Sequence, residues 1–176
     1  KIKIGRISIA FLDKILLEDL LIKDQKNDTL AFISRLYVTI DQGKRKNKFI
    51  INKVDIETAT FHLSRDKKTG DYNYWFITDY FESGSKSTSK PMGIHLREIH
   101  LANVDLDYDD NRKYYSTFGM DYDHLKIRNI WLDINDMEIK DDVYKGHISH
   151  LSATEKSGFI LDKLAGYAKV SPKGIC

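Results

Sequence analysis

The stretch from Ile94 to Tyr108, IHLREIHLANVDLDY, constrains the fold more than any other part of the sequence. Its apolar residues alternate with polar ones, which is typical of a strand with one buried face. The alternation slips by one residue at Glu98 and again at Asn103, and then resumes. An inserted residue turns every later side chain to the other face unless the backbone bulges or bends. The pattern therefore predicts a bent strand whose apolar face stays continuous.

The same unit, apolar-x-apolar-x-x-apolar-x-apolar, recurs along the chain, and this repetition predicts a mainly β, repetitive architecture. Bent strands with one apolar face curl a sheet, so we expect a curled antiparallel sheet that forms a half-open, β-taco-like groove. The residue before the resumed alternation is often a turn or bulge former, as at Arg6, Asp19, Thr58, Asn103 and Asn129. The other copies of the unit are Ile2, Ile4, Ile7, Ile9; Ile15, Leu17, Leu20, Ile22; Val54, Ile56, Ala59, Phe61; Leu125, Ile127, Ile130, Leu132; and, more weakly, Gly146, Ile148, Leu151, Ala153 and Phe159, Leu161, Leu164, Gly166.

Length and charge narrow the class of protein. A chain of 176 residues is long enough for one domain with a sizeable core. The chain has 28 Lys and Arg residues and 26 Asp and Glu residues, so its net charge is +2, which gives no reason to expect a nucleic-acid partner. The basic run at 43–48 is best interpreted as a solvated loop. No apolar run approaches the roughly 20 residues that span a bilayer. The single cysteine, Cys176, excludes an internal disulfide.

A few segments depart from the repeated unit. Asn73 can cap a helix, and the aromatic residues after it recur at helical spacing, which predicts a short helix over 74–81. Residues 83–91 are low in complexity and predict a flexible loop rather than a domain boundary. Three further stretches are expected to be strands. Leu30, Phe32, Leu36, Val38 and Ile40 share one parity, and Tyr114, Phe118, Met120 and Tyr122 alternate into the strand that follows. Met137 and Ile139 are expected to begin a separate strand.

Chemistry-bearing motifs are scarce, so we expect no enzyme, no metal and no cofactor. Asp105, Asp107 and Asp109 sit at the spacing of calcium ligands, but the loop lacks the glycine and glutamate that an EF-hand requires. The polar face of a strand running into a turn is the better interpretation. His147 and His150 have no third ligand beside them and are interpreted as a surface pair. No catalytic triad or phosphate-binding glycine loop can be assembled from the sequence.

Over nearly its whole length the chain resembles the TamB-like branch of the AsmA superfamily, particularly the form found in Bacteroidetes. The opening stretch after Lys1 is similar to that family's amino-terminal signature, with IG at 4–5, DTL at 28–30 and LYVTID at 36–41. Four later stretches carry the same resemblance. They are NYWFITDYF, LANVDLDYDD, GMDYDHLKIRNI and EKSGFILDKL. Each is a structural pattern rather than a catalytic signature, so the resemblance concerns architecture more than activity.

The resemblance implies a periplasmic protein that is anchored to the inner membrane and reaches toward the outer membrane. Such proteins form a long β-groove linked to phospholipid movement, and also to outer-membrane protein assembly with an insertase barrel partner. This chain has neither the family's membrane helix nor its carboxy-terminal region. We therefore expect residues 1–176 to be a single β-groove segment of a longer chain, a fragment without the anchor.

The residues alone leave open whether the apolar face is the core of a closed sheet or an open slot for acyl chains, and without the resemblance the closed core ranks first. Three functions compete: a phospholipid conduit, a scaffold that templates strands for membrane-protein assembly, and a β-sandwich that binds sugars through Trp75 and Trp131. The conduit is preferred. Ten residues are expected to face its groove: Val54, Ile56, Phe61, Ile99, Leu101, Val104, Leu106, Ile127, Ile130 and Leu132.

Overall fold

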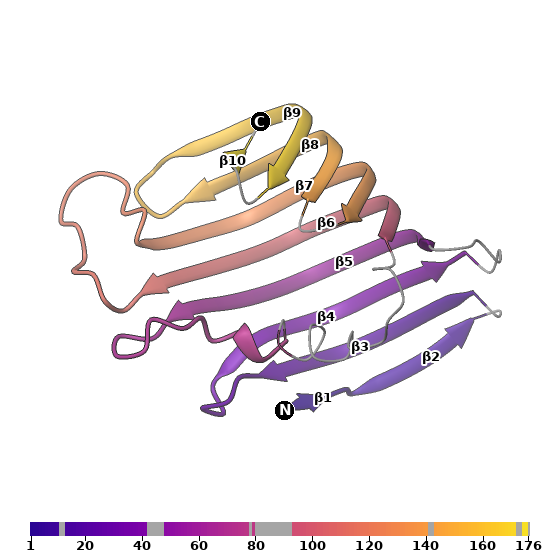
Figure 1. Cartoon of the computed structure of the whole chain (residues 1–176), viewed down its shortest axis with the longest axis horizontal. Helices are drawn as coiled ribbons and strands as arrows, with labels where there is room; N and C mark the ends of the chain where they lie inside the picture. The colour runs from indigo at the N-terminus through magenta and orange to yellow at the C-terminus, as the bar shows by residue number, and fades with distance from the viewer. Residues whose placement is uncertain are drawn as a thin grey trace.

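The computed structural model is a ten-stranded sheet, and it describes residues 1–10, 13–41, 48–77, 79, 93–140, 143–171 and 174–175. In the sheet, β1 and β2 both pair with β3, and the order then runs from β3 to β10 in sequence (Figure 1). The strands are β1 (Ile2–Lys3), β2 (Arg6–Ala10), β3 (Lys14–Lys23), β4 (Thr29–Ile40), β5 (Lys48–Arg65), β6 (Gly93–Asp110), β7 (His124–Lys140), β8 (Val143–Glu155), β9 (Ile160–Ser171) and β10 (Gly174–Ile175).

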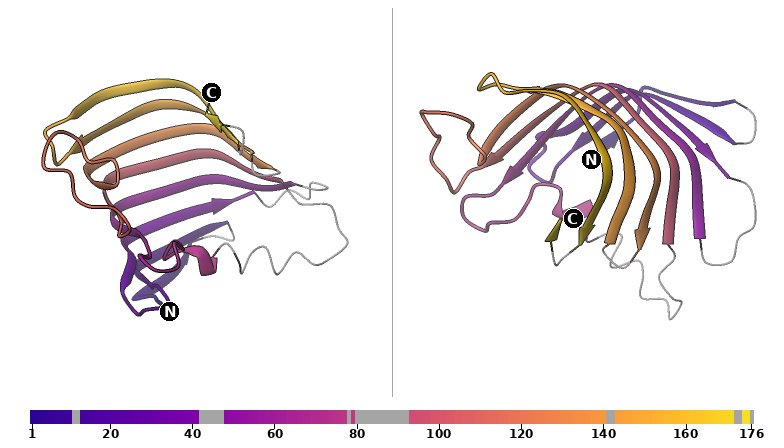
Figure 2. Two further views of the ribbon diagram at one scale, coloured as in Figure 1. Left: turned by 60° about the vertical axis from the view of Figure 1, so that its left-hand side comes forward. Right: turned by 90° about the horizontal axis from the view of Figure 1, so that it is seen from above.

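The sheet is an open arch rather than a barrel or a sandwich. Every contact between described strands joins sheet neighbours, and the first and last strands do not meet. Figure 2 shows the strands curling together over one hollow side, which confirms the expected curled, half-open sheet. No described helix is long and apolar enough to cross a membrane.

The bends fall where the repeated unit places them. Asp19, Thr58, Asn103 and Asn129 have φ angles of 53°, 54°, 55° and 52°, in the left-handed region that non-glycine residues seldom adopt. Each occupies the extra position between two apolar pairs, so the strand turns there and its apolar side chains return to the same face. In the first copy the interruption is at Gly5, between β1 and β2, and not at Arg6, which is the first residue of β2. The backbone N–H of Gly5 donates to the carbonyl of Glu18 at 3.1 Å.

All neighbouring strands are antiparallel except β5 and β6, which are parallel over their full shared length. A parallel pair requires a connection that returns to the starting end of the sheet, usually through a helix. Residues 66–92 make this connection. It contains the expected short helix, which is described at residues 75–77 and 79 and lies below the arch in the right-hand view of Figure 2.

Three strand expectations need correction. Residues 111–123 form a loop, so Tyr114, Phe118 and Tyr122 do not extend β7. The apolar residues of β4 do not share one parity, because Ile33 takes the inner position and Phe32 lies on the other face, 38% exposed. Finally, β7 does not end before Met137 but continues to Lys140 through a further bend at Asp136, where φ is 52°. The local alternation of apolar and polar residues is similar in all three cases. Pairing with a neighbouring strand determines whether a segment is a strand, where it ends and which face its residues take.

Several expectations lie outside the described residues. They are the basic loop except Lys48, the flexible loop at 83–91, the end of the helix at 80–81, and Cys176.

Candidate functional site

The ten residues predicted to line a groove lie on one face of the sheet. Residues paired across neighbouring strands point to the same side. The pairings of β5, β6 and β7 join the ten into four rows that cross these strands. The rows are Val54–Ile99, Ile56–Leu101–Leu132, Val104–Ile130 and Phe61–Leu106–Ile127. The register therefore places these residues in rows on a shared face, and their role in a groove is a proposal.

These rows continue beyond the three central strands. The row through Leu101 runs without a polar residue from β2 to β9, and the row through Ile99 does the same until it reaches Gly166 in β9. The first row is Ile7, Leu17, Leu36, Ile56, Leu101, Leu132, Leu151 and Leu164. Eight strands about 4.8 Å apart make an apolar stripe roughly 34 Å long. It runs perpendicular to the strands, along the axis of the arch.

Burial identifies the apolar face as the inner side of the bends. Leu20, Ile33, Ala59 and Val104 are 7%, 5%, 3% and 2% exposed, although only one layer of strands is present among the described residues. Side chains inside a bend converge and cover one another, whereas those outside diverge. The residues at the bends themselves, such as Thr58 and Asn103, are exposed. Val104 is thus the one fully buried member of the ten, and the other nine are half-buried.

The outer face is polar and is held by ion pairs between neighbouring strands. Arg35 contacts Glu57 at 3.1 Å, across β4 and β5. On β6 and β7, His100 Nδ1 lies 2.5 Å from Asp133 Oδ1, and the indole of Trp131 donates to the other oxygen of the same carboxylate. Polar and charged side chains therefore occupy the convex surface, whereas the apolar rows lie on the concave one.

The aspartate and histidine sets that resemble metal-ligand groups in the sequence lie on this outer face. Asp105 and Asp107 both contact Arg128, whose Nη1 is 2.5 Å from Asp107 Oδ1, so their charges are paired within the sheet. His147 and His150 face Asn135 and Asp133, and a bulge between them puts both on the outer side. Among the described residues no three His, Cys, Asp or Glu side chains are placed to hold a metal ion.

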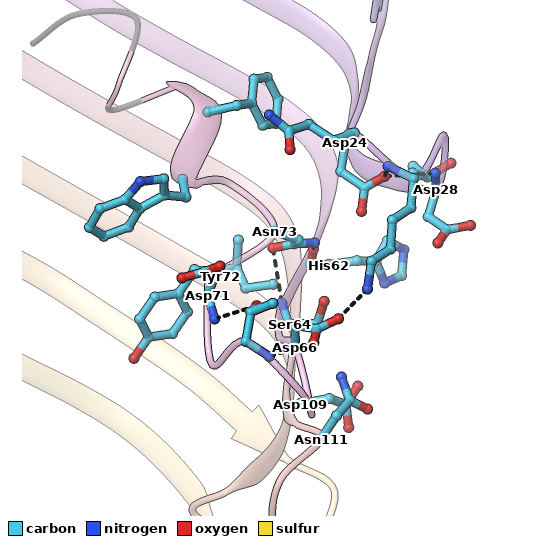
Figure 3. A pocket seen from close by; sticks show the side chains of 17 residues that line it. Asp24, Asp28, His62, Ser64, Asp66, Asp71, Tyr72, Asn73, Asp109 and Asn111 are labelled. Atoms are coloured by element: carbon cyan, nitrogen blue, oxygen red, sulfur yellow. Dashed lines mark hydrogen bonds and ion pairs between the residues drawn. The ribbon is translucent and has the colours of Figure 1, made fainter. Parts of the chain in front are cut away.

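A second concave site lies at the end of the strands, beneath the start of the crossover connection (Figure 3). It is a cavity of about 470 Å³ that sequence reasoning missed, because its lining comes from four separate segments. Most of its lining residues are polar, and Leu63, Tyr72, Trp75 and Phe76 complete it. Asp24 accepts the backbone N–H groups of Lys26 and Asp28, each at 2.9 Å. Lys26 also donates to Asp66 across the cavity, and this hydrogen bond lowers the pKa of the Asp66 carboxyl. The carboxylates of Asp24 and Asp66 thus have partners inside the protein.

The two tryptophans proposed for sugar binding do not share a site. Trp75, 52% exposed, lines the end cavity, whereas Trp131 stacks edge-on against His100 on the outer face of β7. A sugar platform built from both is therefore not formed, and the described strands make one layer rather than a sandwich.

The fold and its apolar face define the class: an open, arched β-sheet with a continuous aliphatic inner surface. No protein-family model matches the chain, and no curated protein shows significant similarity to it.

Proposed function

We propose that this chain is a segment of a periplasmic, bridge-like lipid conduit, and that its inner face shields phospholipid acyl chains moving between the inner and outer membranes. In this proposal the full-length protein is anchored to the inner membrane and uses no enzymatic chemistry. The resemblance to TamB-like proteins supports the setting, and the inner face supports the chemistry.

The observation that carries the proposal is the unbroken aliphatic row from Ile7 to Leu164. Moving a 16-carbon acyl chain into water costs on the order of 13 kcal/mol of free energy, at roughly 0.8 kcal/mol per methylene. A conduit must therefore offer apolar cover at every step. The hydrocarbon core of a bilayer is about 30 Å thick and holds two acyl chains end to end. A stripe of roughly 34 Å is therefore about twice the length of one acyl chain.

The test introduces a charge into the stripe at Leu132, whose neighbours in the row are Leu101 and Leu151. Leu132→Arg should abolish photo-crosslinking of phospholipid to the inner face. The protein should still fold, because Leu132 is only half-buried and an arginine can extend its charged end toward water. Trp131→Arg is the matched control. It places the same charge one residue away on the outer face, so crosslinking should be unchanged.

Circular dichroism melts of both variants complete the experiment. Retained melting with lost crosslinks supports the conduit. Unfolding of Leu132→Arg would mean that the stripe is an ordinary core, and unchanged crosslinks would mean that lipid takes another path.

A scaffold for outer-membrane protein assembly is the second candidate, and the edge of the sheet favours it. β9 is twelve residues long, yet β10 pairs only with Val170 and Ser171, so most of its outer edge has no strand partner among the described residues. An exposed edge can template an incoming strand. A photo-crosslinker at the exposed Lys163 in β9 should then capture nascent barrel strands, whereas one at the exposed Lys14, in an internal strand, should not. The insertase barrel partner would bind through regions outside this chain.

A further inference from the structure

The loop between β6 and β7, residues 111–123, exposes more aromatic surface than any other described turn. Tyr114 is 95% exposed, Phe118 93% and Tyr122 74%. The seven residues from Tyr114 to Met120 carry no charge, although charged residues make up 31% of the chain. Depletion of charge together with enrichment of Tyr, Phe and Met is the composition of the core of a protein interface. We call Tyr114–Tyr122 the aromatic tip.

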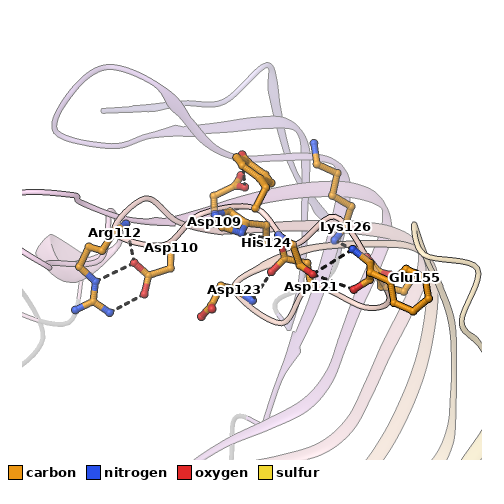
Figure 4. A network of polar contacts seen from close by, with 11 residues as sticks. Asp109, Asp110, Arg112, Asp121, Asp123, His124, Lys126 and Glu155 are labelled. Carbon is orange, nitrogen blue, oxygen red and sulfur yellow. Dashed lines mark hydrogen bonds and ion pairs between the residues drawn. The ribbon is translucent and has the colours of Figure 1, made fainter.

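The base of this loop is built to hold the tip outward (Figure 4). The Asp121 carboxylate accepts the backbone N–H of Ser116 at 2.7 Å and contacts the buried His124 ring at 3.0 Å. The Tyr115 ring stacks on His124 with 3.8 Å between centroids, and its hydroxyl donates to Asp109. The Tyr115 ring thus ties the loop to the sheet, while the rings of Tyr114, Phe118 and Tyr122 do not fold back onto it.

These rings contribute little to folding because they stay in water, whereas each buried aromatic side chain removes roughly 150–250 Å² from solvent. Exposed apolar patches of this kind mark interaction sites on soluble proteins. Three rings and the neighbouring Met120 offer on the order of 500 Å² on one chain. Two such tips packed together would bury about 1,000 Å² in total, which reaches the lower bound for a specific interface.

Charge on the stems of the loop makes the tip complementary to itself. Lys113 immediately precedes the tip and Asp123 immediately follows it, and both are exposed. Neither side chain forms an ion pair with the described residues. In a two-fold arrangement the same patch is used on both chains. A residue at the start of one tip can therefore contact a residue at the end of the other tip, and the reverse contact forms as well. Lys113 of one chain would then face Asp123 of the other. A partner whose surface carried charges of a single sign would place a like charge opposite either Lys113 or Asp123.

We propose that the aromatic tip is a homodimer interface, in which two copies of the chain pack tip to tip about a two-fold axis with Lys113 opposite Asp123. This places the arched sheets end to end, with the tips between them, and leaves both inner faces free. It is independent of whether the inner face carries lipid.

The first experiment is sedimentation equilibrium of the purified 176-residue chain over a range of concentrations. The wild type should form a dimer. Tyr114→Ser combined with Phe118→Ser should raise the dimer dissociation constant at least about tenfold, because truncating aromatic anchors typically costs more than about 1 kcal/mol. Phe159→Ser is the matched control, since Phe159 is an exposed aromatic residue (53%) in a different turn. It should leave the dimer unchanged.

The second experiment is a charge exchange that does not depend on the aromatic variants folding. Lys113→Glu and Asp123→Lys should each weaken the dimer, and the double variant should restore it, because the exchanged pair again has opposite signs. A monomeric wild type, a dimer unaffected by the aromatic variant, or single and double charge variants of equal affinity would each overturn the proposal. Flotation of the wild type on phosphatidylethanolamine vesicles, lost in the aromatic variant while no dimer forms, would instead assign the tip to a membrane surface and would also overturn it.

Discussion

The centre and the edges of the sheet carry the same apolar pattern but bury it very differently. Ile33 and Val104, in central strands, are 5% and 2% exposed, whereas Ile7 in β2 and Leu164 in β9 are 59% and 42% exposed. In a single layer a side chain is covered only by its own sheet neighbours. An edge strand has a neighbour on one side alone, so its inner face stays open. The repeat therefore decides which face is apolar, and position in the sheet decides how much of that face is buried.

The sharpest way to break this comparison is to place the same charge at the centre and at the edge. Val104→Asp should lower the free energy of unfolding by about 3–5 kcal/mol, because the carboxylate would be buried without a partner. Leu164→Asp should cost no more than about 1 kcal/mol, since its side chain already reaches water. Urea denaturation followed by circular dichroism measures both. Equal losses would show that a further layer covers the edge as well.

A smaller effect is expected at the bends that create the buried centre. Asn103 has a φ of 55°, which a β-branched residue adopts only with strain. Asn103→Val should therefore destabilise the protein by about 1–3 kcal/mol relative to Asn103→Gly. Both variants lose the hydrogen bond from the Asn103 amide to Thr58 Oγ1, so the difference between their unfolding free energies measures the backbone strain at this position. Similar midpoints for the two variants in urea would mean that the strand bends by another route.

The smallest expected effect concerns the strand end, away from the apolar rows. Asp110 is 3% exposed, and hydrogen bonds from Arg112 hold the pKa of its carboxyl well below its usual range. A lowered folded-state pKa adds stability that is fully present above the unfolded value of about 3.9 and is lost as pH falls toward the folded value. Asp110→Asn should therefore lower the melting temperature at pH 7, with a difference from wild type that narrows below about pH 4.

The exposed Asp162→Asn serves as the control for this pH series and should melt like the wild type at each pH. A melting difference for Asp110→Asn that stays constant down to about pH 2 would point to lost packing rather than lost charge.

The repeated unit allowed the inner face and most bends to be predicted from sequence. Four of the five residues named as bend formers have positive φ, and all ten candidate groove residues share a face, because both follow from counting residues between apolar positions. The parallel pairing of β5 with β6 was not predictable in this way, since local patterns do not encode which strand lies beside which after a long connection.

The aromatic tip and the end cavity were missed for related reasons. Tyr114 to Tyr122 alternate as a strand would, but no described strand pairs with them and they form a loop. The cavity depends on side chains brought together from the β3–β4 turn, the end of β5, the start of the crossover and the end of β6. No short stretch of sequence carries that information.

Because each described strand contacts only its immediate sheet neighbours, cooperativity in this protein should be that of a one-dimensional array. A change that stabilises one strand affects distant strands only through the strand pairs that lie between them. Unfolding should then begin by fraying from β1 and β9, and amide hydrogens should exchange in an order that follows distance from the nearer edge. The strands around β5 and β6 would be the last to lose protection, and a single global melting temperature would describe only them.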